Sequence, residues 1–171
     1  RGLGDVYKRQ SLIMLYSMEE GLGDSSELVP MLDDAIAGDP QNIELWFSRA
    51  QIFVSLEDYD EAIASLEKAI ELNPQSYEAQ FFTGYYIIMK ADALNQEANE
   101  KEYTNAGEYE ADQKEILSIY SQAVPYLEVA HEIMPQNPDP VQLLKTLCYR
   151  LRDEPGMMEK YEKYNELYKQ M

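Results

Sequence analysis

A three-residue pattern recurs along the chain and sets the length of its structural unit. It occurs as Pro40-Gln41-Asn42, Pro74-Gln75-Ser76 and Pro135-Gln136-Asn137. The first two copies lie 34 residues apart, and the second and third lie 61 apart, which is 34 plus 27. A fixed period of this size predicts stacked units that bury a shared core. We therefore divide the chain into four units, the third with a 27-residue insertion: 9–42, 43–76, 77–137 and 138–171.

The second unit shows what one repeat contains. Two amphipathic stretches are separated by the polar segment Glu57–Asp60, and Pro74 ends the second stretch, because proline lacks an N–H and disfavours a helical residue before it. Small and apolar side chains recur at helical spacing in both stretches. They are Trp46, Ala50 and Phe53 in the first, and Ala62, Leu66, Ala69 and Ile70 in the second. The unit is therefore predicted to be a helical hairpin.

The order of these residues resembles a known family. A tryptophan, a small residue four positions later, an aromatic three after that, then Asp58-Tyr59-x-x-Ala62 and a final proline resemble the tetratricopeptide repeat over Ile43–Ser76. The resemblance implies an all-α superhelix of about four helical hairpins, with residues 11–171 as a single domain. The outer units depart from the pattern, as terminal repeats often do because they cap the stack.

The insertion, residues 90–116, carries eight acidic and three basic residues. It keeps a helical rhythm on both sides of a turn signal at Thr104–Gly107. We interpret it as lengthening both helices of the third unit into a protruding hairpin, with a disordered acidic loop as the alternative. Pro125 is expected to kink or divide the returning helix.

The two ends of the chain carry separate expectations. Residues 1–10, RGLGDVYKRQ, resemble a translated sequencing adaptor, so we treat them as a non-native leader and expect upstream repeats to be missing. An uncapped first repeat could then self-associate. A first helix is expected at Ser11–Glu20 and a second one ends near Ala37. The last hairpin is expected to turn at Arg152–Glu154 and restart at Pro155.

The charge balance limits the classes of partner. Acidic residues outnumber basic ones 32 to 14, which gives a net charge of −18. A nucleic-acid binder needs a basic surface that displaces counterions from phosphates, and an anionic membrane surface is disfavoured for the same reason. No apolar run reaches the ~20 residues of a membrane span. A neutral or basic protein partner fits this charge, although acidity can also simply keep a repeat surface soluble.

Chemistry-bearing residues are sparse. His131 is the only histidine, and Glu128-x-x-His131 is half of the motif that di-iron bundles use twice, so we expect a helix-surface residue. Cys148, the only cysteine, is expected to be a buried small hydrophobe. No zinc-ligand set or nucleophile signature accompanies them. We therefore expect no enzyme, no metal and no cofactor.

The family resemblance also implies a binding surface. In tetratricopeptide proteins, the first helices of successive repeats line a concave groove that receives a peptide. Carried over by position, the groove residues are Glu44, Phe47, Gln51, Glu78, Phe81, Tyr85, Gln142 and Tyr149. Aromatic and acidic side chains there favour a peptide with apolar anchors and Lys or Arg. In the alternative interpretation, Phe81 and Phe82 simply pack against neighbouring helices.

The leading hypothesis is a non-catalytic protein–protein interaction scaffold that binds a peptide segment in this groove. The alternative is a structural subunit that docks onto a larger complex through the acidic hairpin 90–116. Tyr149-Arg150-Leu151-Arg152-Asp153 and Met158-Glu159-Lys160-Tyr161 resemble segments of bacterial cell-envelope members of the family, which suggests a periplasmic location.

Overall fold

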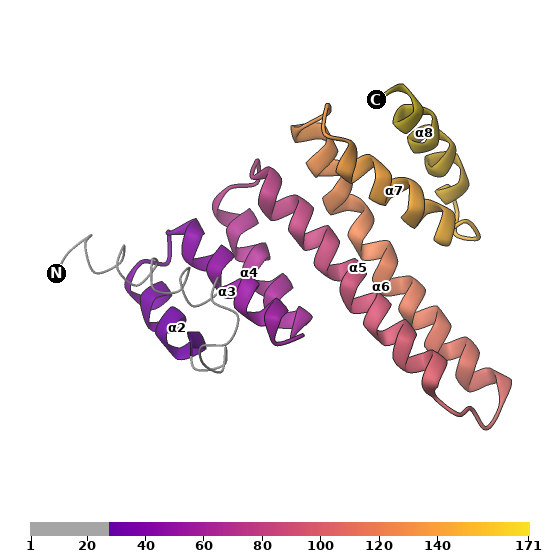
Figure 1. The fold of residues 1–171 in the computed structure, drawn as a ribbon, viewed down its shortest axis with the longest axis horizontal. Helices are drawn as coiled ribbons and strands as arrows, with labels where there is room; N and C mark the ends of the chain where they lie inside the picture. The colour runs from indigo at the N-terminus through magenta and orange to yellow at the C-terminus, as the bar shows by residue number, and fades with distance from the viewer. Residues whose placement is uncertain (1–27) are drawn as a thin grey trace. The chain divides into compact units, whose positions relative to one another are not determined.

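The computed structural model describes residues 28–171, and this part of the chain contains α-helices and no strand. The expectations for the leader, for the helix at residues 11–20 and for the turn after it lie outside the described residues. The all-α prediction is confirmed (Figure 1). The helices are α2 (Leu28–Gly38), α3 (Ile43–Ser55), α4 (Tyr59–Leu72), α5 (Tyr77–Glu100), α6 (Ala106–Ile133), α7 (Pro138–Arg150) and α8 (Met157–Gln170).

The chain divides into two compact units between Pro74 and Gln75. Helices α2 to α4 belong to unit 1, and helices α5 to α8 belong to unit 2.

The recurring three-residue pattern supplies a helix N-cap each time it occurs. The side chain of Asn42 accepts a hydrogen bond from the backbone N–H of Glu44 at 3.2 Å. Ser76 caps α5 in the same way and Asn137 caps α7, with N–H to oxygen distances of 3.2 and 3.0 Å. A capping side chain satisfies one of the N–H groups that a helix start leaves unpaired. The repeat period of the sequence is thus the distance between capped helix starts.

Unit 1 is built around a small apolar core. Leu32, Ala35 and Ile36 of α2 meet Leu45 and Ile52 of α3, and Trp46 packs against this cluster while half-buried. The indole N–H of Trp46 donates to the carbonyl of Pro40 at 3.0 Å, which holds the turn before α3 against the helix. The small residues expected between the helices are fully buried, which allows α3 and α4 to approach closely: Ala50, Ala62 and Ala69.

Arg49 is a charged residue inside this packing. Its guanidinium donates to Asp33 of α2 at 2.9 Å, and to the Glu61 carboxylate at 2.9 Å and Ser65 at 2.7 Å on α4. It also lies 4.5 Å from the ring centroid of Phe53. An apolar residue would fill space at this position, whereas Arg49 ties three helices together through charge-assisted hydrogen bonds.

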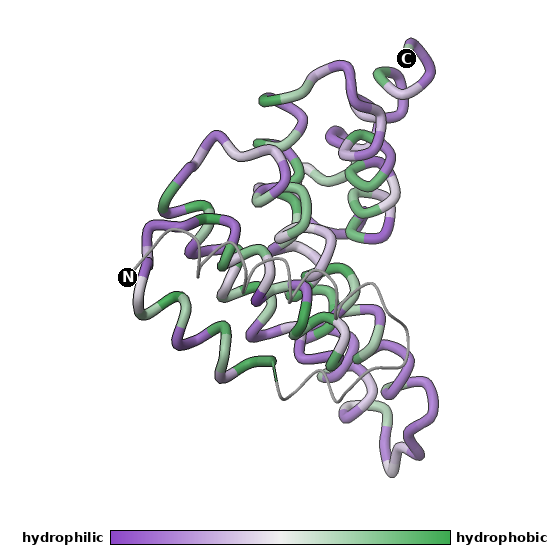
Figure 2. Tube along the Cα trace, turned by 60° about the vertical axis from the view of Figure 1, so that its left-hand side comes forward, coloured by the Kyte–Doolittle hydropathy of each residue, from purple (hydrophilic) through white to green (hydrophobic). Residues whose placement is uncertain are grey.

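Unit 2 is dominated by the hairpin of α5 and α6. These helices have 24 and 28 residues, against 13 and 14 for α3 and α4. The chain stays helical through the acidic segment and leaves helix only at residues 101–105. We call residues 90–116 the arm. Its turn lies beyond α7 and α8 (Figure 1), and this turn end is mostly hydrophilic (Figure 2).

α5 and α6 pack most closely at Gly84. A Cβ atom at this position would lie 2.7 Å from Cγ of Leu127 and 3.3 Å from the carbonyl oxygen of Ala123. Gly84, Leu127 and Ala123 are all buried. The glycine therefore allows the backbone of α5 to lie directly against α6.

Pro125 does not divide α6, which continues from Ala106 to Ile133 with the proline inside it. Val124 and Leu127 on either side of the proline are buried in unit 2. Packing of these neighbours holds the helix together where one backbone hydrogen bond is lost, because tertiary contacts offset that loss.

The last hairpin differs from the expectation at its second helix. α8 begins at Met157 and not at Pro155. Gly156 has φ of +78°, in the left-handed region, so it ends the turn and cannot form part of the right-handed helix. α8 is joined to α6 through Glu128, whose carboxylate accepts from Lys160 at 2.9 Å and from the Tyr164 hydroxyl at 2.8 Å.

Candidate interaction surface

Three aromatic rings stack along one face of α5. Tyr77, Phe81 and Tyr85 are spaced by four residues, which places them on the same side of a helix. The ring centroids of Tyr77 and Phe81 are 5.6 Å apart with planes 12° from parallel, and those of Phe81 and Tyr85 are 6.2 Å apart with planes 4° from parallel. We call these three residues the aromatic ladder. Its regular spacing follows from the helix repeat.

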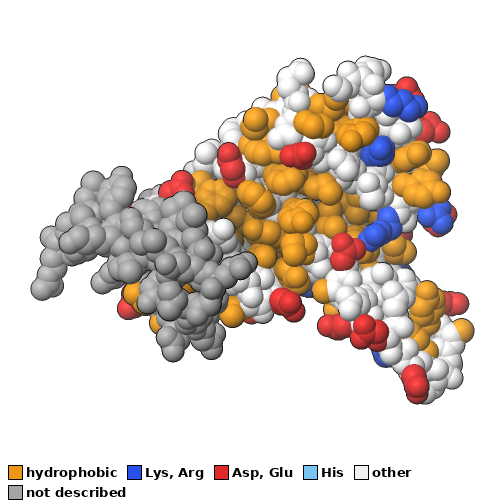
Figure 3. All heavy atoms as spheres, in the orientation of Figure 1, with side chains coloured by type: hydrophobic (Ala, Val, Ile, Leu, Met, Phe, Trp, Pro, Cys, Tyr) orange, Lys and Arg blue, Asp and Glu red, His pale blue; other side chains and the backbone are white. Residues whose placement is uncertain are grey.

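A second row of rings lies beside the ladder. Phe82 and Tyr86 have centroids 5.8 Å apart, and contacts of 5.5 Å (Phe81–Phe82) and 6.1 Å (Tyr85–Tyr86) join the two rows. Phe82 and Tyr85 are each 38% exposed, whereas burial raises the pKa of the half-buried Tyr86. Hydrophobic side chains gather on the face of unit 2 seen in Figure 3. Large exposed apolar areas of this kind often mark interaction sites.

Side-chain hydrogen bonds join α7 to α5 near both ends of α7. At its start, the side-chain amide of Asn137 donates to the Tyr77 hydroxyl at 2.8 Å. At its end, Arg150 donates to Asp92 at 2.9 Å. These partners are 15 residues apart on α5 and 13 apart on α7, or roughly 20 Å of helix in both cases at 1.5 Å per residue. The two helices therefore run in the same direction along this length.

A residue of α6 joins the contact between Arg150 and Asp92. The Tyr120 hydroxyl donates to the carboxylate of Asp92, and the guanidinium of Arg150 lies 4.3 Å from the centroid of the Tyr120 ring. Burial first, and then the hydrogen bond to Asp92, raise the pKa of Tyr120. One residue from each of three helices thus meets at this point and fixes where α7 lies.

The predicted groove residues of unit 2 lie on the two helices that these ties connect. Glu78 and Tyr85 are exposed and Phe81 is half-buried on α5, while Gln142 and Tyr149 are exposed on α7. Tyr149 is 52% exposed. Its ring lies 5.2 Å from that of Tyr161 on α8 and is covered by Arg152 at 5.2 Å. The structure therefore orients Tyr149 by contacts with α8 and the turn before it.

The predicted groove residues of unit 1 lie on α3. Glu44 and Gln51 are exposed, and Phe47 is half-buried. They belong to the other compact unit.

Charge is distributed unevenly along the α5–α7 face. At the start of the two helices, Tyr77 has a raised pKa because of burial first, and then because of the negative charges of Asp139 and Glu78. Farther along, Asp92 is already paired with Arg150. The end of the face near Tyr77 is therefore the acidic one.

The residues that could have carried catalysis are engaged in packing. His131 is half-buried, not a surface residue, and its ring meets Tyr164 edge-on at 6.4 Å. Cys148 is fully buried as expected, and burial raises its pKa to about 11, so that the reactive thiolate is rare at neutral pH. Within residues 28–171 no group of three or more His, Cys, Asp or Glu side chains is placed to hold a metal ion.

The comparisons with known proteins concern the repeat motif and the fold. The family model of the tetratricopeptide repeat matches residues 43–76, the segment that carries the motif. The chain therefore contains a tetratricopeptide repeat at these residues. A human relative, tetratricopeptide repeat protein 28 of Homo sapiens, is 35% identical over 75 residues, which are 42% of this chain and 3% of the relative. The chain thus spans a small fraction of that relative's length.

A solved structure titled "MamA MSR-1 C2" has a similar fold. It is 18% identical in sequence, the alignment covers 97% of this chain and 78% of that one, and the TM-score is 0.62. At this level of identity the likeness concerns the fold alone. In residues 28–171, no helix combines the length and the apolar character needed to cross a membrane. The tetratricopeptide fold of this chain is one that serves protein–protein interaction scaffolds.

Proposed function

We propose that this protein is a non-catalytic scaffold that binds a peptide segment on the α5–α7 face. The aromatic ladder supports the proposal most directly, because its rings stack along one side of α5, with Tyr85 exposed and the other two half-buried. Aromatic rings that stay partly exposed in a free protein are common anchors of interfaces.

The ladder also suggests the form of the ligand. Neighbouring rings are 5.6 and 6.2 Å apart. In an extended chain, alternate side chains on one side are spaced by roughly 6.5 Å. An extended peptide lying along α5 could therefore place every second side chain against the ladder.

The charge pattern adds a preference for basic residues. Glu78 and Asp139 lie near Tyr77 at one end of the face, and both are exposed. A Lys or Arg of the peptide would meet these carboxylates while its apolar side chains contact the rings. The net charge of −18 favours the approach of a basic ligand from a distance.

A selection from a library of displayed random peptides tests the proposal. We expect the purified chain to enrich peptides with alternating apolar residues and at least one Lys or Arg. The double variant Tyr85→Ala/Tyr149→Ala should bind these peptides at least about tenfold more weakly, because each position loses an exposed aromatic contact of roughly 1 kcal/mol or more.

The matched control is Tyr109→Ala/Tyr168→Ala, which removes two other exposed tyrosines, one on the arm and one on α8. Its binding should equal that of the unaltered protein, and circular dichroism should show the same helix content in all variants. Equal binding by both double variants would contradict the α5–α7 face. Loss of binding only on deletion of residues 91–116 would place the function on the arm.

A further inference from the structure

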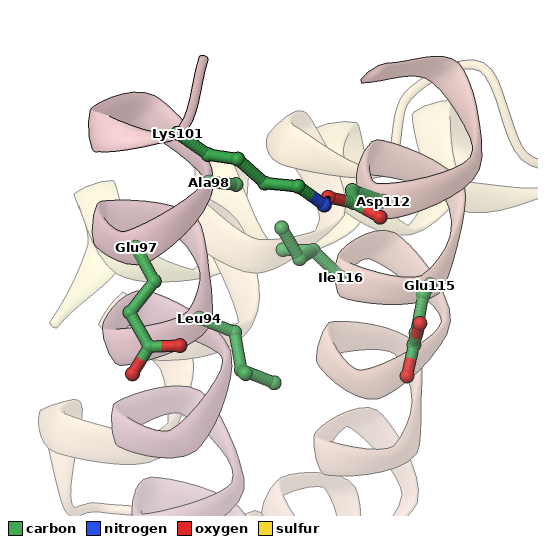
Figure 4. Close-up of a pocket in the computed structure, with 7 residues that line it drawn as sticks. All are labelled: Leu94, Glu97, Ala98, Lys101, Asp112, Glu115 and Ile116. Carbon is green, nitrogen blue, oxygen red and sulfur yellow. Dashed lines mark hydrogen bonds and ion pairs between the residues drawn. The ribbon is translucent and has the colours of Figure 1, made fainter. Parts of the chain in front are cut away.

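A hollow lies between α5 and α6 close to the turn of the arm. It has a volume of about 200 Å³, and its centre is apolar, formed by Leu94, Ala98 and Ile116. Glu97 of α5 and Glu115 of α6 stand on opposite sides of it (Figure 4). We call the space between these five residues the arm notch.

One end of the arm notch is closed by an ion pair. Lys101 reaches from α5 to Asp112 on α6, with Nζ 2.6 Å from Oδ2, and the hydroxyl of Tyr103 donates to the same oxygen at 3.1 Å (Figure 4). The hydrogen bond from Lys101 first, and then that from Tyr103, lower the pKa of Asp112. The cation that pairs with Asp112 is therefore Lys101, which belongs to the arm itself.

The turn next to the notch is held in one conformation. Asn105 caps α6 by accepting from the backbone N–H of Glu108 at 3.1 Å. The carboxylate of Glu108 in turn accepts from the N–H and the hydroxyl of Thr104 at 3.2 and 2.8 Å. This arrangement is similar to a capping box, except that Glu108 bonds Thr104, the residue before the N-cap, instead of the N-cap N–H. The notch is thus formed before any partner binds.

Unlike Asp112, Glu97 and Glu115 have no cationic side chain of the described residues as an ion-pair partner. Neither makes an ion pair or a side-chain hydrogen bond with another residue of the described segment. Two carboxylates on either side of an apolar surface repel each other. A ligand with a positive charge and an alkyl chain would remove the repulsion and cover the apolar centre at once.

We propose that the arm notch binds a lysine side chain of a partner protein. The four-carbon stem of lysine would lie on Leu94, Ala98 and Ile116, as such stems commonly do on apolar surfaces. Its ammonium has three donors that can point to carboxylates on both sides, whereas the planar fork of arginine pairs best with one carboxylate. The excess of eight acids over three bases in residues 90–116 favours a basic partner. This surface is separate from the α5–α7 face and does not depend on it.

The experiment is an NMR titration of the full ¹⁵N-labelled chain with the peptide acetyl-Gly-Lys-Gly-amide. We expect amide shifts concentrated at residues 94–98 and 112–116. The norleucine peptide has the same stem without the charge, and methylammonium has the charge without the stem. Both ligands should shift these amides far less, because the norleucine peptide cannot pair with the carboxylates and methylammonium cannot cover the apolar centre.

The variant Glu97→Gln/Glu115→Gln should weaken binding of the lysine peptide by about tenfold. The matched control Glu102→Gln/Glu110→Gln removes the same net charge from exposed positions of the arm outside the notch, and should bind within about twofold of the unaltered protein. Equal losses in both variants, or shifts spread over the whole acidic surface, would overturn the proposal. If the amide shifts at the notch changed with protein concentration in the absence of peptide, the ligand would be a second copy of this chain. That result would overturn the proposal of a separate partner protein.

Discussion

At the scale of single residues, several polar side chains in this protein join helices that apolar packing alone would leave less precisely placed. Arg49 binds residues of α2 and α4, Asp92 binds Tyr120 and Arg150, and Glu128 binds Lys160 and Tyr164. Charge-assisted hydrogen bonds are directional, so they fix the rotation and register of a helix as well as its distance. Glu128 offers the clearest test.

The pKa of Glu128 reflects two opposed effects. Burial raises it, but the hydrogen bonds from Lys160 and Tyr164 outweigh burial, so the pKa in the folded protein lies below the ordinary value of 4.5. The folded state therefore holds this proton less tightly than the unfolded state. The stabilisation is complete above the ordinary value and is lost as the pH falls through the lower folded pKa.

We expect Glu128→Gln to lower the free energy of unfolding by about 1 kcal/mol near neutral pH, a value reduced because the pair is partly exposed. The difference from the unaltered protein should shrink as the pH falls below about 4.5. Urea denaturation at a series of pH values measures it. Glu162→Gln, at an exposed position of α8, is the control. A difference that stayed constant down to low pH would show that the charge of Glu128 is not the cause.

At the scale of elements, the pair of long helices α5 and α6 determines unit 2. It presents the aromatic ladder, carries the arm, and provides the surface on which α7 packs. Its close contact at Gly84 sets how near the two helices lie. Helix pairs that touch through small residues have little room for added atoms.

Gly84→Ala should therefore be destabilising, although alanine is the better helix former. A new Cβ would lie 2.7 Å from Cγ of Leu127, an atom near the backbone that cannot swing away freely. Overpacking costs about 1–3 kcal/mol and the gain in helix propensity is about 1 kcal/mol, so a net loss of up to about 2 kcal/mol is expected.

Thermal unfolding followed by circular dichroism measures this loss. Gly38→Ala is the matched control, because a Cβ at Gly38 would meet nothing within 4 Å. That control should be neutral or slightly stabilised. A stabilised Gly84→Ala would mean that α5 and α6 move apart at little cost.

At the scale of the whole molecule, the large net negative charge opposes compactness. A chain with 32 acidic and 14 basic residues repels itself when compact. Its ion pairs, such as Lys68–Glu71 and Lys169–Glu166, are mostly exposed and contribute little each. Added salt should therefore weaken the repulsion between acidic side chains more than it weakens the attraction within the ion pairs.

We expect the melting temperature to rise as sodium chloride increases from low concentration to about 0.5 M. Each kcal/mol gained in the free energy of unfolding should raise the melting temperature by about 2–4 °C, as for domains of this size. The variant Glu102→Gln/Glu110→Gln, with two fewer negative charges, should respond less. A melting temperature that falls with salt would show that the ion pairs outweigh the general repulsion.

The sequence by itself determined the local organisation of this protein. The starts of α3, α5 and α7 could be predicted because the residues that end one helix and cap the next are adjacent, as in Pro74-Gln75-Ser76. The helical spacing of apolar residues in 43–76 predicted a helical hairpin, and the resemblance of this segment to the tetratricopeptide repeat implied the all-α repeat fold. The burial of Cys148 followed from the same pattern.

Only the tertiary structure decided how distant residues meet. Asn137 contacts Tyr77 from 60 positions away, and Arg150 contacts Asp92 from 58 away. Glu128 and His131 suggested half a metal motif, yet Glu128 binds two residues of α8 and His131 packs against one of them. The arm notch depends on which sides of α5 and α6 face each other. Periodicity gives the face of a helix, but the partner of that face is set by the packing of all helices together.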